Sequence, residues 1–132
     1  MEITVSTGKG RVPVSILHVS GNIDSATNMA FEAKANELIK GGARHLLVDL
    51  TDVPYMSSAG LRALSAILNE LRAVNSDVSE PDMLKGINAG TYKSPHLKLL
   101  NLSKQTRTAF ETAGFDMYIE TFTDRDKAIA SF

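Results

Sequence analysis

Two adjacent serines, Ser57 and Ser58, are the residues of this chain whose type and position could do chemistry. They follow the apolar run 46–50 after a short linker, and they open an amphipathic stretch that ends at Val74. A serine between a buried strand and a helix can be an N-cap, a phosphate acceptor or the nucleophile of a hydrolase. The elements around the two serines must distinguish these roles.

The stretch 57–74 predicts the helix that would carry both serines. Its apolar side chains form one helical stripe, made of Leu61, Leu64, Ile67, Leu68, Leu71 and Val74. Extrapolated back along the helix, Ser57 lies about 35° from the centre of that stripe and Ser58 about 135° from it. We therefore expect Ser57 to point inward or to cap the helix, and Ser58 to face solvent beside Arg62. The free N–H groups and the helix dipole at this end favour a phosphate on an exposed hydroxyl.

The rest of the chain alternates strand and helix patterns, with a bulge or two-sided burial expected near residue 16. The expected elements are a hairpin with its turn at 8–11, a helix from about 27 to the glycines 41–42, a strand at 46–50, a strand at 97–102, a helix at 104–113, a short strand at 118–123 and a helix at 124–131. This order predicts an α/β fold, with a small mixed, mainly parallel sheet that opens with an antiparallel hairpin and is flanked by about four helices. We expect one domain, residues 1–132, with 75–95 as an extended surface loop.

The composition excludes several classes of function. The 14 basic and 15 acidic residues give a net charge of −1, so nothing indicates binding to nucleic acid or to a membrane surface. The chain has no cysteine, which excludes a disulfide framework, a thiolate metal site and a cysteine nucleophile. There is no signal peptide pattern, and no apolar run approaches the ~18 residues of a membrane span. We expect a cytoplasmic protein that binds proteins or small molecules.

A serine hydrolase is the first alternative for the serine pair. Chain order alone permits Ser58 to pair with His96, but the G-x-S-x-G pattern is absent because position 56 is Met. We expect His18, His45 and His96 to be satisfied structural histidines. No spacing indicates a metal site, and we expect residues 8–10 to form a hairpin turn, not a phosphate cradle. The sequence therefore predicts a protein without cofactor that is not an enzyme.

The segment around the serines resembles the STAS domains of the anti-sigma factor antagonists. The family signature, Asp-x-[ST]-x-[VIL]-x-[FY]-[IM]-Asp-Ser-[ST]-Gly-[LIV], is matched in register by Asp49, Thr51, Val53, Tyr55, Met56, Ser58, Gly60 and Leu61. The turn 21–24 resembles the family's Gly-x-[IL]-Asp turn, and the segment 97–103 fits as well. The resemblance covers essentially the whole chain.

The resemblance implies a switch that works by protein binding. A family member of this type binds an anti-sigma factor that is also a serine kinase; the kinase phosphorylates the serine matching Ser58, the complex separates, and a phosphatase resets the cycle. By this match the partner-binding residues are Asp24, Ser57, Ser58, Ala59, Gly60 and Arg62.

Positions 57 and 59 depart from the family, because Ser57 stands where the signature has an acidic residue and Ala59 where it has Ser or Thr. Ser57 is therefore a second-choice phosphate acceptor. The departure also leaves an alternative open, a non-switching STAS scaffold or docking subunit of a stress-sensing or transport-associated assembly.

Overall fold

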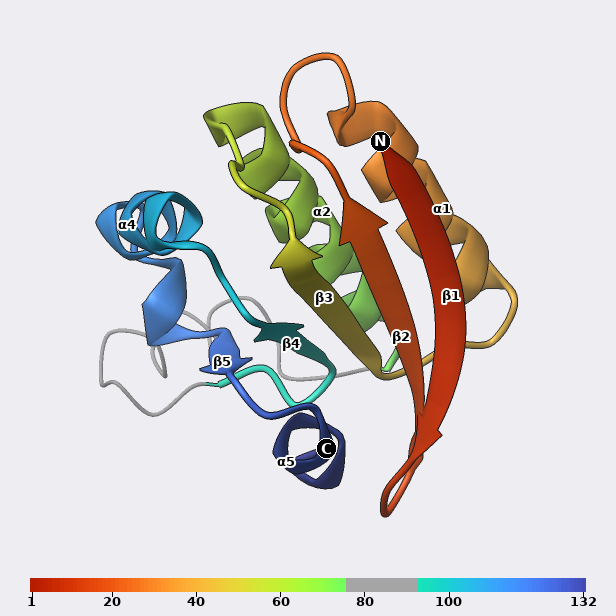
Figure 1. Cartoon of the computed structure of the whole chain (residues 1–132). Coiled ribbons are helices and arrows are strands. Elements are labelled where there is room, and N and C mark those ends of the chain that lie inside the picture. Colours follow the sequence, from red (N-terminus) through yellow and green to blue (C-terminus); the bar gives the residue numbers. More distant parts are fainter. Residues whose placement is uncertain (76–92) are drawn as a thin grey trace.

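Five strands form one mixed sheet in a computed structural model that describes residues 1–75 and 93–132 (Figure 1). The strands are β1 (Glu2–Lys9), β2 (Pro13–Ser20), β3 (Leu46–Asp52), β4 (Leu97–Leu100) and β5 (Glu120–Phe122), and they lie side by side in chain order. β1 and β2 are antiparallel, whereas the pairs β2–β3, β3–β4 and β4–β5 are parallel. The predicted fold class is confirmed. Most of the predicted loop 75–95 lies outside the described residues.

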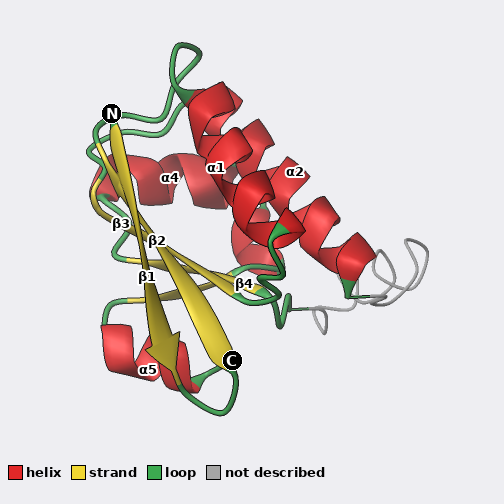
Figure 2. Cartoon of the chain, turned by 90° about the vertical axis from the view of Figure 1, so that its right-hand side faces the viewer, coloured by secondary structure: helices red, strands yellow, loops and turns green. Residues whose placement is uncertain are grey.

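Helices cover both faces of this sheet. α1 (Asn28–Lys40) and α2 (Ser58–Val74) pack side by side on one face, and the short α5 (Arg125–Ala130) packs on the other (Figure 2). α4 (Lys104–Thr112) and the 3-10 helix η1 (Phe115–Met117) lie beyond the β4–β5 side (Figure 1). None of the helices in the described ranges is long and apolar enough to cross a membrane.

The two faces of the sheet carry two cores of unequal size. The larger core fills the space under α1 and α2 and includes Leu17, Val19, Phe31, Val48, Leu64 and Ile67; the smaller core lies under α5 and consists of Val14, Ile16, Leu47, Leu100, Ala128, Ile129 and Phe132. β2 therefore supplies side chains to both cores, which explains why its apolar pattern changes phase near residue 16. Its pairing with β1 is continuous there, so two-sided burial is the correct interpretation. An irregularity lies further along, between His18 and Ser20, in the pairing with β3.

The second half of the chain differs from prediction at element ends. β4 stops at Leu100 and not at Leu102, because Asn101 adopts a left-handed backbone with φ of 58°. This conformation is one that asparagine tolerates better than most residues, and it lets the amide of Asn101 donate to the carbonyl of Phe122 at 2.8 Å. The 3-10 helix η1 was not predicted. α5 begins after Asp124, whose carboxylate accepts from the amide of Lys127 at 3.0 Å as an N-cap.

Candidate functional site

The segment between β3 and α2 carries the two serines, and it is fixed to the end of β2. An isolated parallel bridge pairs Ile23 with Met56. The amide of Ile23 donates to the carbonyl of Tyr55 at 3.0 Å, and the amide of Ser57 donates to the carbonyl of Ile23 at 2.8 Å. Both segments lie at the same end of the sheet, where β2 and β3 finish (Figure 1). The bridge therefore brings the 21–24 turn and the start of α2 together.

Gly60 is required for this close approach. A Cβ at position 60 would lie 2.5 Å from the Cγ of Met56 and 2.9 Å from the carbonyl oxygen of Ile23. Both distances are shorter than side chains tolerate, so the first turn of α2 can lie against Ile23 only with glycine at this position. The glycine of the family signature thus has a steric role here.

The two serines have different surroundings. Ser58 is exposed at the first position of α2, as helical phase predicts, and Arg62 is exposed one turn further on. Ser57 is the N-cap residue, but its side chain makes no capping hydrogen bond. Its hydroxyl oxygen is buried and has no hydrogen-bond partner in the described part of the chain. Of the two expected alternatives for Ser57, the structure shows the inward one, and the capping hydrogen bond is not formed.

Asp24 closes a compact turn that leads into α1. Its carboxylate accepts from the amide of Ala26 at 2.9 Å, and its own amide donates to the hydroxyl of Thr27 at 3.0 Å. The Thr27 hydroxyl lies 2.8 Å from the carbonyl oxygen of Asn22, to which it donates. Asp24 is half-buried and follows Ile23 directly, so it borders the start of α2.

The predicted partner-binding residues do not all reach the surface. Ser58 and Arg62 are exposed, whereas Ala59 and Gly60 are buried. Two exposed apolar side chains at the same end of the molecule are not among the predicted partner-binding residues. They are Tyr55, which is 41% exposed, and Met29, which is 78% exposed. The exposure of Met29 could have been predicted from the sequence, because position 29 lies outside the helical stripe of buried side chains formed by Phe31, Ala35 and Ile39.

A polar network on the α5 side of the sheet adjoins the same segment. His18 on β2 lies between two carboxylates of β3, with its Nδ1 3.0 Å from Asp49 and its Nε2 3.0 Å from Asp52. Asp49 also accepts from the amide and hydroxyl of Thr51, whose hydroxyl accepts from the Asn101 side chain at 2.9 Å. This network holds the end of β3 from both neighbouring strands.

The network shifts two pKa values. The hydrogen bond to Asp49 raises the pKa of His18 above its ordinary 6.5, and the opposing effect of burial is smaller. Burial alone would raise the pKa of Asp49, but the hydrogen bonds from Thr51 and His18 lower it below its ordinary value of 3.8. Both shifts favour the charged forms of the pair.

A hydrogen bond also connects the segment between β3 and α2 to α4. The hydroxyl of Ser103, the N-cap of α4, donates to the carbonyl of Pro54 at 2.8 Å and accepts from the amide of Thr106 at 3.1 Å. The path from β3 to Ser58 is thus attached on one side to β2 and on the other to α4.

The histidine of the hydrolase alternative lies far from Ser58. The carbonyl of His96 accepts from the amide of Leu46, at the start of β3, and its ring lies 3.4 Å from that of His45. Ser58 follows the opposite end of β3, and that seven-residue strand spans about 20 Å. A direct contact between Ser58 and His96 is therefore excluded.

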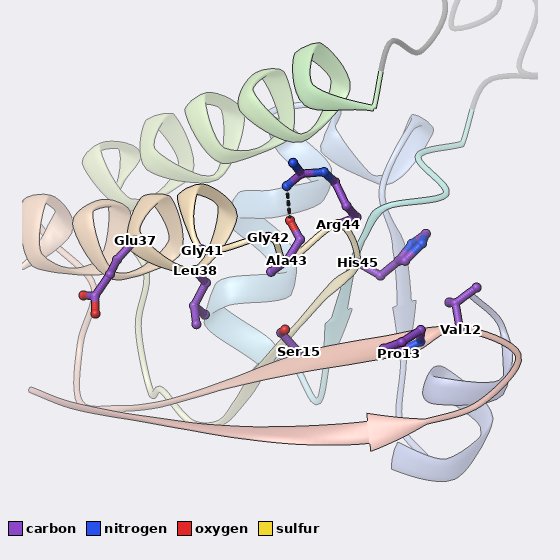
Figure 3. A pocket seen from close by; sticks show the side chains of 10 residues that line it. All are labelled: Val12, Pro13, Ser15, Glu37, Leu38, Gly41, Gly42, Ala43, Arg44 and His45. Carbon is purple, nitrogen blue, oxygen red and sulfur yellow. Dashed lines mark hydrogen bonds between the residues drawn. The ribbon is translucent and has the colours of Figure 1, made fainter.

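A pocket of about 550 Å³ lies at the end of the sheet away from Ser58, between the end of α1 and the start of β2 (Figure 3). Its cationic side chain is already engaged, because Arg44 donates to the carbonyls of Ala43 at 2.9 Å and Ile39 at 3.0 Å. This contact satisfies the carboxyl end of α1. The lining residues are Val12, Pro13, Ser15, Glu37, Leu38, Gly41, Gly42, Ala43, Arg44 and His45.

Known proteins share this sequence pattern and this architecture. Residues 6–79 match the model of the STAS domain family. A Bordetella bronchiseptica protein named as an anti-sigma factor antagonist, BtrV, is 27% identical over 114 residues, which cover 86% of this chain and 82% of that protein.

Solved structures agree in fold. An anti-sigma factor antagonist from Mycobacterium paratuberculosis has a TM-score of 0.67 at 21% identity, over 98% of this chain and 93% of that one. The phosphorylated form of the Bacillus cell fate determinant SpoIIAA has a TM-score of 0.62 at 17% identity, over 97% and 96% of the two chains. Since the family model spans more than half of the sequence and the strand-to-helix signature lies where the fold requires it, the chain belongs to the STAS domain family.

Proposed function

We propose that this protein is an anti-sigma factor antagonist that binds an anti-sigma factor with serine kinase activity and is released when Ser58 is phosphorylated. The observation that carries the proposal is the contrast between the two serines at the start of α2. Ser58 is exposed, whereas the hydroxyl oxygen of Ser57 is buried. A kinase needs an accessible hydroxyl, so Ser58 is the proposed acceptor and the burial of the Ser57 hydroxyl keeps Ser57 the second choice.

The physical setting suits a reversible charge switch. A phosphate at the first helical position meets free backbone N–H groups and the positive end of the helix dipole. Arg62 lies four residues on, within reach of a charge at position 58 on the same helical surface. The fold therefore tolerates the modification, while a docked partner meets about two added negative charges.

The relatives support the same proposal. BtrV and the Mycobacterium paratuberculosis protein are named as anti-sigma factor antagonists, and SpoIIAA was solved in a phosphorylated form. We infer that the chain acts by binding and not by catalysis, in the cytoplasm, with a kinase-type anti-sigma factor and a phosphatase as its partners. The docking surface would consist of the 21–24 turn and the exposed side chains Tyr55, Ser58 and Arg62.

The test is phosphorylation by candidate anti-sigma factor kinases, with the site mapped by mass spectrometry. We expect phosphate on Ser58, loss of it in Ser58→Ala and retention in Ser57→Ala, the matched control. A partner that binds the unmodified chain should bind Ser58→Asp at least about tenfold more weakly. Full affinity of Ser58→Asp would contradict the release mechanism.

A second candidate, a docking subunit without a switch, is favoured by one observation, the replacement of the signature's acidic residue by Ser57. It predicts a stable complex in which no kinase partner modifies Ser58. Binding without phosphorylation would therefore select this candidate over the switch.

A further inference from the structure

The contact of His18 with two carboxylates specifies the protonation state of its ring. Nδ1 lies 3.0 Å from Oδ2 of Asp49, and Nε2 lies 3.0 Å from Oδ2 of Asp52. An ionised carboxylate only accepts hydrogen bonds, and a neutral imidazole carries a single N–H. Both contacts are therefore hydrogen bonds only when the ring carries two protons as an imidazolium.

We propose that His18 is a positioning residue that, as an imidazolium, ties the segment leading to Ser58 to strand β2, and that loss of its proton releases Asp52. The tie spans the one irregular step in the β2–β3 pairing. His18 is the register partner of Asp49, but Ser20 pairs with Asp52, so between these pairs one residue on β2 faces two on β3. The ring thus bridges side chains on both sides of this bulge, where the backbone ladder is interrupted.

The two carboxylates respond differently when the ring is deprotonated. The Asp49 side chain is 16% exposed and is held by the amide and hydroxyl of Thr51, whereas the Asp52 side chain is 57% exposed. The neutral ring keeps its remaining proton on the nitrogen that faces Asp49. The unprotonated Nε2 then faces the Asp52 carboxylate. Because both groups are hydrogen-bond acceptors, they repel each other, and the Asp52 side chain moves away from the ring into solvent.

Groups on the neighbouring elements do not compensate for the lost proton. On β1, the uncharged Thr4 is opposite His18, and the acidic Glu2 is opposite Ser20. Beyond β4, Asn101 contributes an amide that bonds to Thr51. The carboxylates around the ring favour the imidazolium, and the raised pKa of His18 agrees with this geometry.

Release of Asp52 would loosen the path to the serine site. The carbonyl of Asp52 accepts from the amide of Gly21 at 2.9 Å, which is the first backbone contact between the segments 20–23 and 52–57. The next contacts are those of Ile23 with Tyr55 and Ser57. Only residues 53–57 separate Asp52 from Ser58, the first residue of α2, so movement of Asp52 would be passed to the start of the helix. The contact of His18 with Asp49 and Asp52 does not depend on the proposed function; only its relevance to Ser58 as a phosphate acceptor does.

The experiment is an NMR pH titration of the isolated chain between pH 5 and 9, which follows the ring nitrogens of His18 and the backbone amides of residues 53–58. We expect the ring to titrate above 6.5, and the amides of this segment to shift with the same midpoint. In His18→Gln, the amides of residues 53–58 should no longer shift with pH at the midpoint seen for the His18 ring. His45→Gln, at the other end of the sheet, is the matched control and should leave it unchanged.

Asp52→Asn provides an independent variant if His18→Gln folds poorly. In it, His18 should still titrate, but with a lower midpoint, and the amides of 53–58 should no longer follow the ring. A His18 midpoint at or below 6.5, or amides that keep the shared midpoint in His18→Gln, would overturn the proposal. Because no partner or kinase is present, the result is independent of whether Ser58 is phosphorylated.

Discussion

Ser57 and Ser103 occupy the same helical position, the N-cap, yet they make different contacts. The Ser103 hydroxyl accepts from the amide of Thr106 and donates to Pro54, whereas the Ser57 hydroxyl is buried without a partner in the described residues. We expect Ser103→Ala to lower the free energy of unfolding by about 1–2 kcal/mol, and Ser57→Ala to change it by less than about 0.5 kcal/mol. Urea denaturation of the two variants measures the difference. Equal losses would mean that Ser57 caps α2 in solution.

The charge pair of His18 and Asp49 makes stability depend on pH in two directions. The pKa of His18 is raised in the fold, so its contribution to stability is complete below 6.5 and is lost as the pH rises through the raised value. The pKa of Asp49 is lowered, so its contribution is present above 3.8 and is lost as the pH falls through the lowered value. We expect the loss of stability in His18→Gln to be larger at pH 6 than at pH 9. Urea denaturation at both pH values tests this, and an equal loss at both would contradict it.

At the residue scale, the sequence could predict what depends on local periodicity. Helical phase alone distinguished the exposed Ser58 from the inward Ser57. It could not predict the contacts of His18, because these depend on the register of β2 against β3 and on a bulge between them. The missing capping bond of Ser57 also depends on a side-chain direction that residue type does not determine.

At the scale of elements, the start of α2 depends on the absence of a side chain at Gly60. We expect Gly60→Ala to destabilise the fold by about 1–3 kcal/mol, because the new methyl group would overlap Met56 and the Ile23 carbonyl. Gly41 at the end of α1 is the control, since its φ of −78° suits alanine and no contact there is shorter than 3.4 Å. Gly41→Ala should stabilise by about 0.4–1 kcal/mol. Thermal and urea unfolding compare the two, and a neutral Gly60→Ala would mean that the two segments separate easily.

The attachment of α5 depends on the buried side chain of Lys98 on β4. Its ammonium donates to the carbonyl and hydroxyl of Ser131 at 2.9 and 3.0 Å, and it lies 3.4 Å from Glu120 and 5.0 Å from the centre of the Phe132 ring. We expect Lys98→Met to cost about 1.5–3 kcal/mol and to speed amide exchange in α5. Lys104→Met, on the exposed first turn of α4, should do neither. Unchanged exchange in Lys98→Met would show that the smaller core holds α5 without the ammonium.

The elements themselves were largely predictable, since alternation and helical stripes specify their type and order. Their ends were less so. The left-handed Asn101 that ends β4 serves the contact with Phe122, and η1 places Phe115 against Phe110 and Tyr118. Both features depend on contacts between different elements, which the local sequence pattern does not predict.

At the scale of the whole molecule, the proposed switch should act on the surface and leave the fold unchanged. We expect Ser58→Asp to keep the wild-type circular dichroism spectrum and to raise the free energy of unfolding by about 0.3–1 kcal/mol, because a negative charge there complements the helix dipole. Ser58→Ala is the uncharged control. Loss of stability in Ser58→Asp alone would mean that added charge disturbs the fold and not only a partner contact.

The order of the strands has a consequence for how the chain is made. Each strand pairs with the strand before it in the sequence, so the sheet can grow in the direction of translation without inserting a strand between two that are already paired. The buried residues of the larger core precede Asn75 except for Leu97, Leu99, Phe110, Phe115 and Ile119. A nascent chain that has emerged from the ribosome as far as Asn75 thus holds three strands, two helices, both serines and the 21–24 turn, and its later residues add to an existing edge and supply the contacts of Asn101 and Ser103.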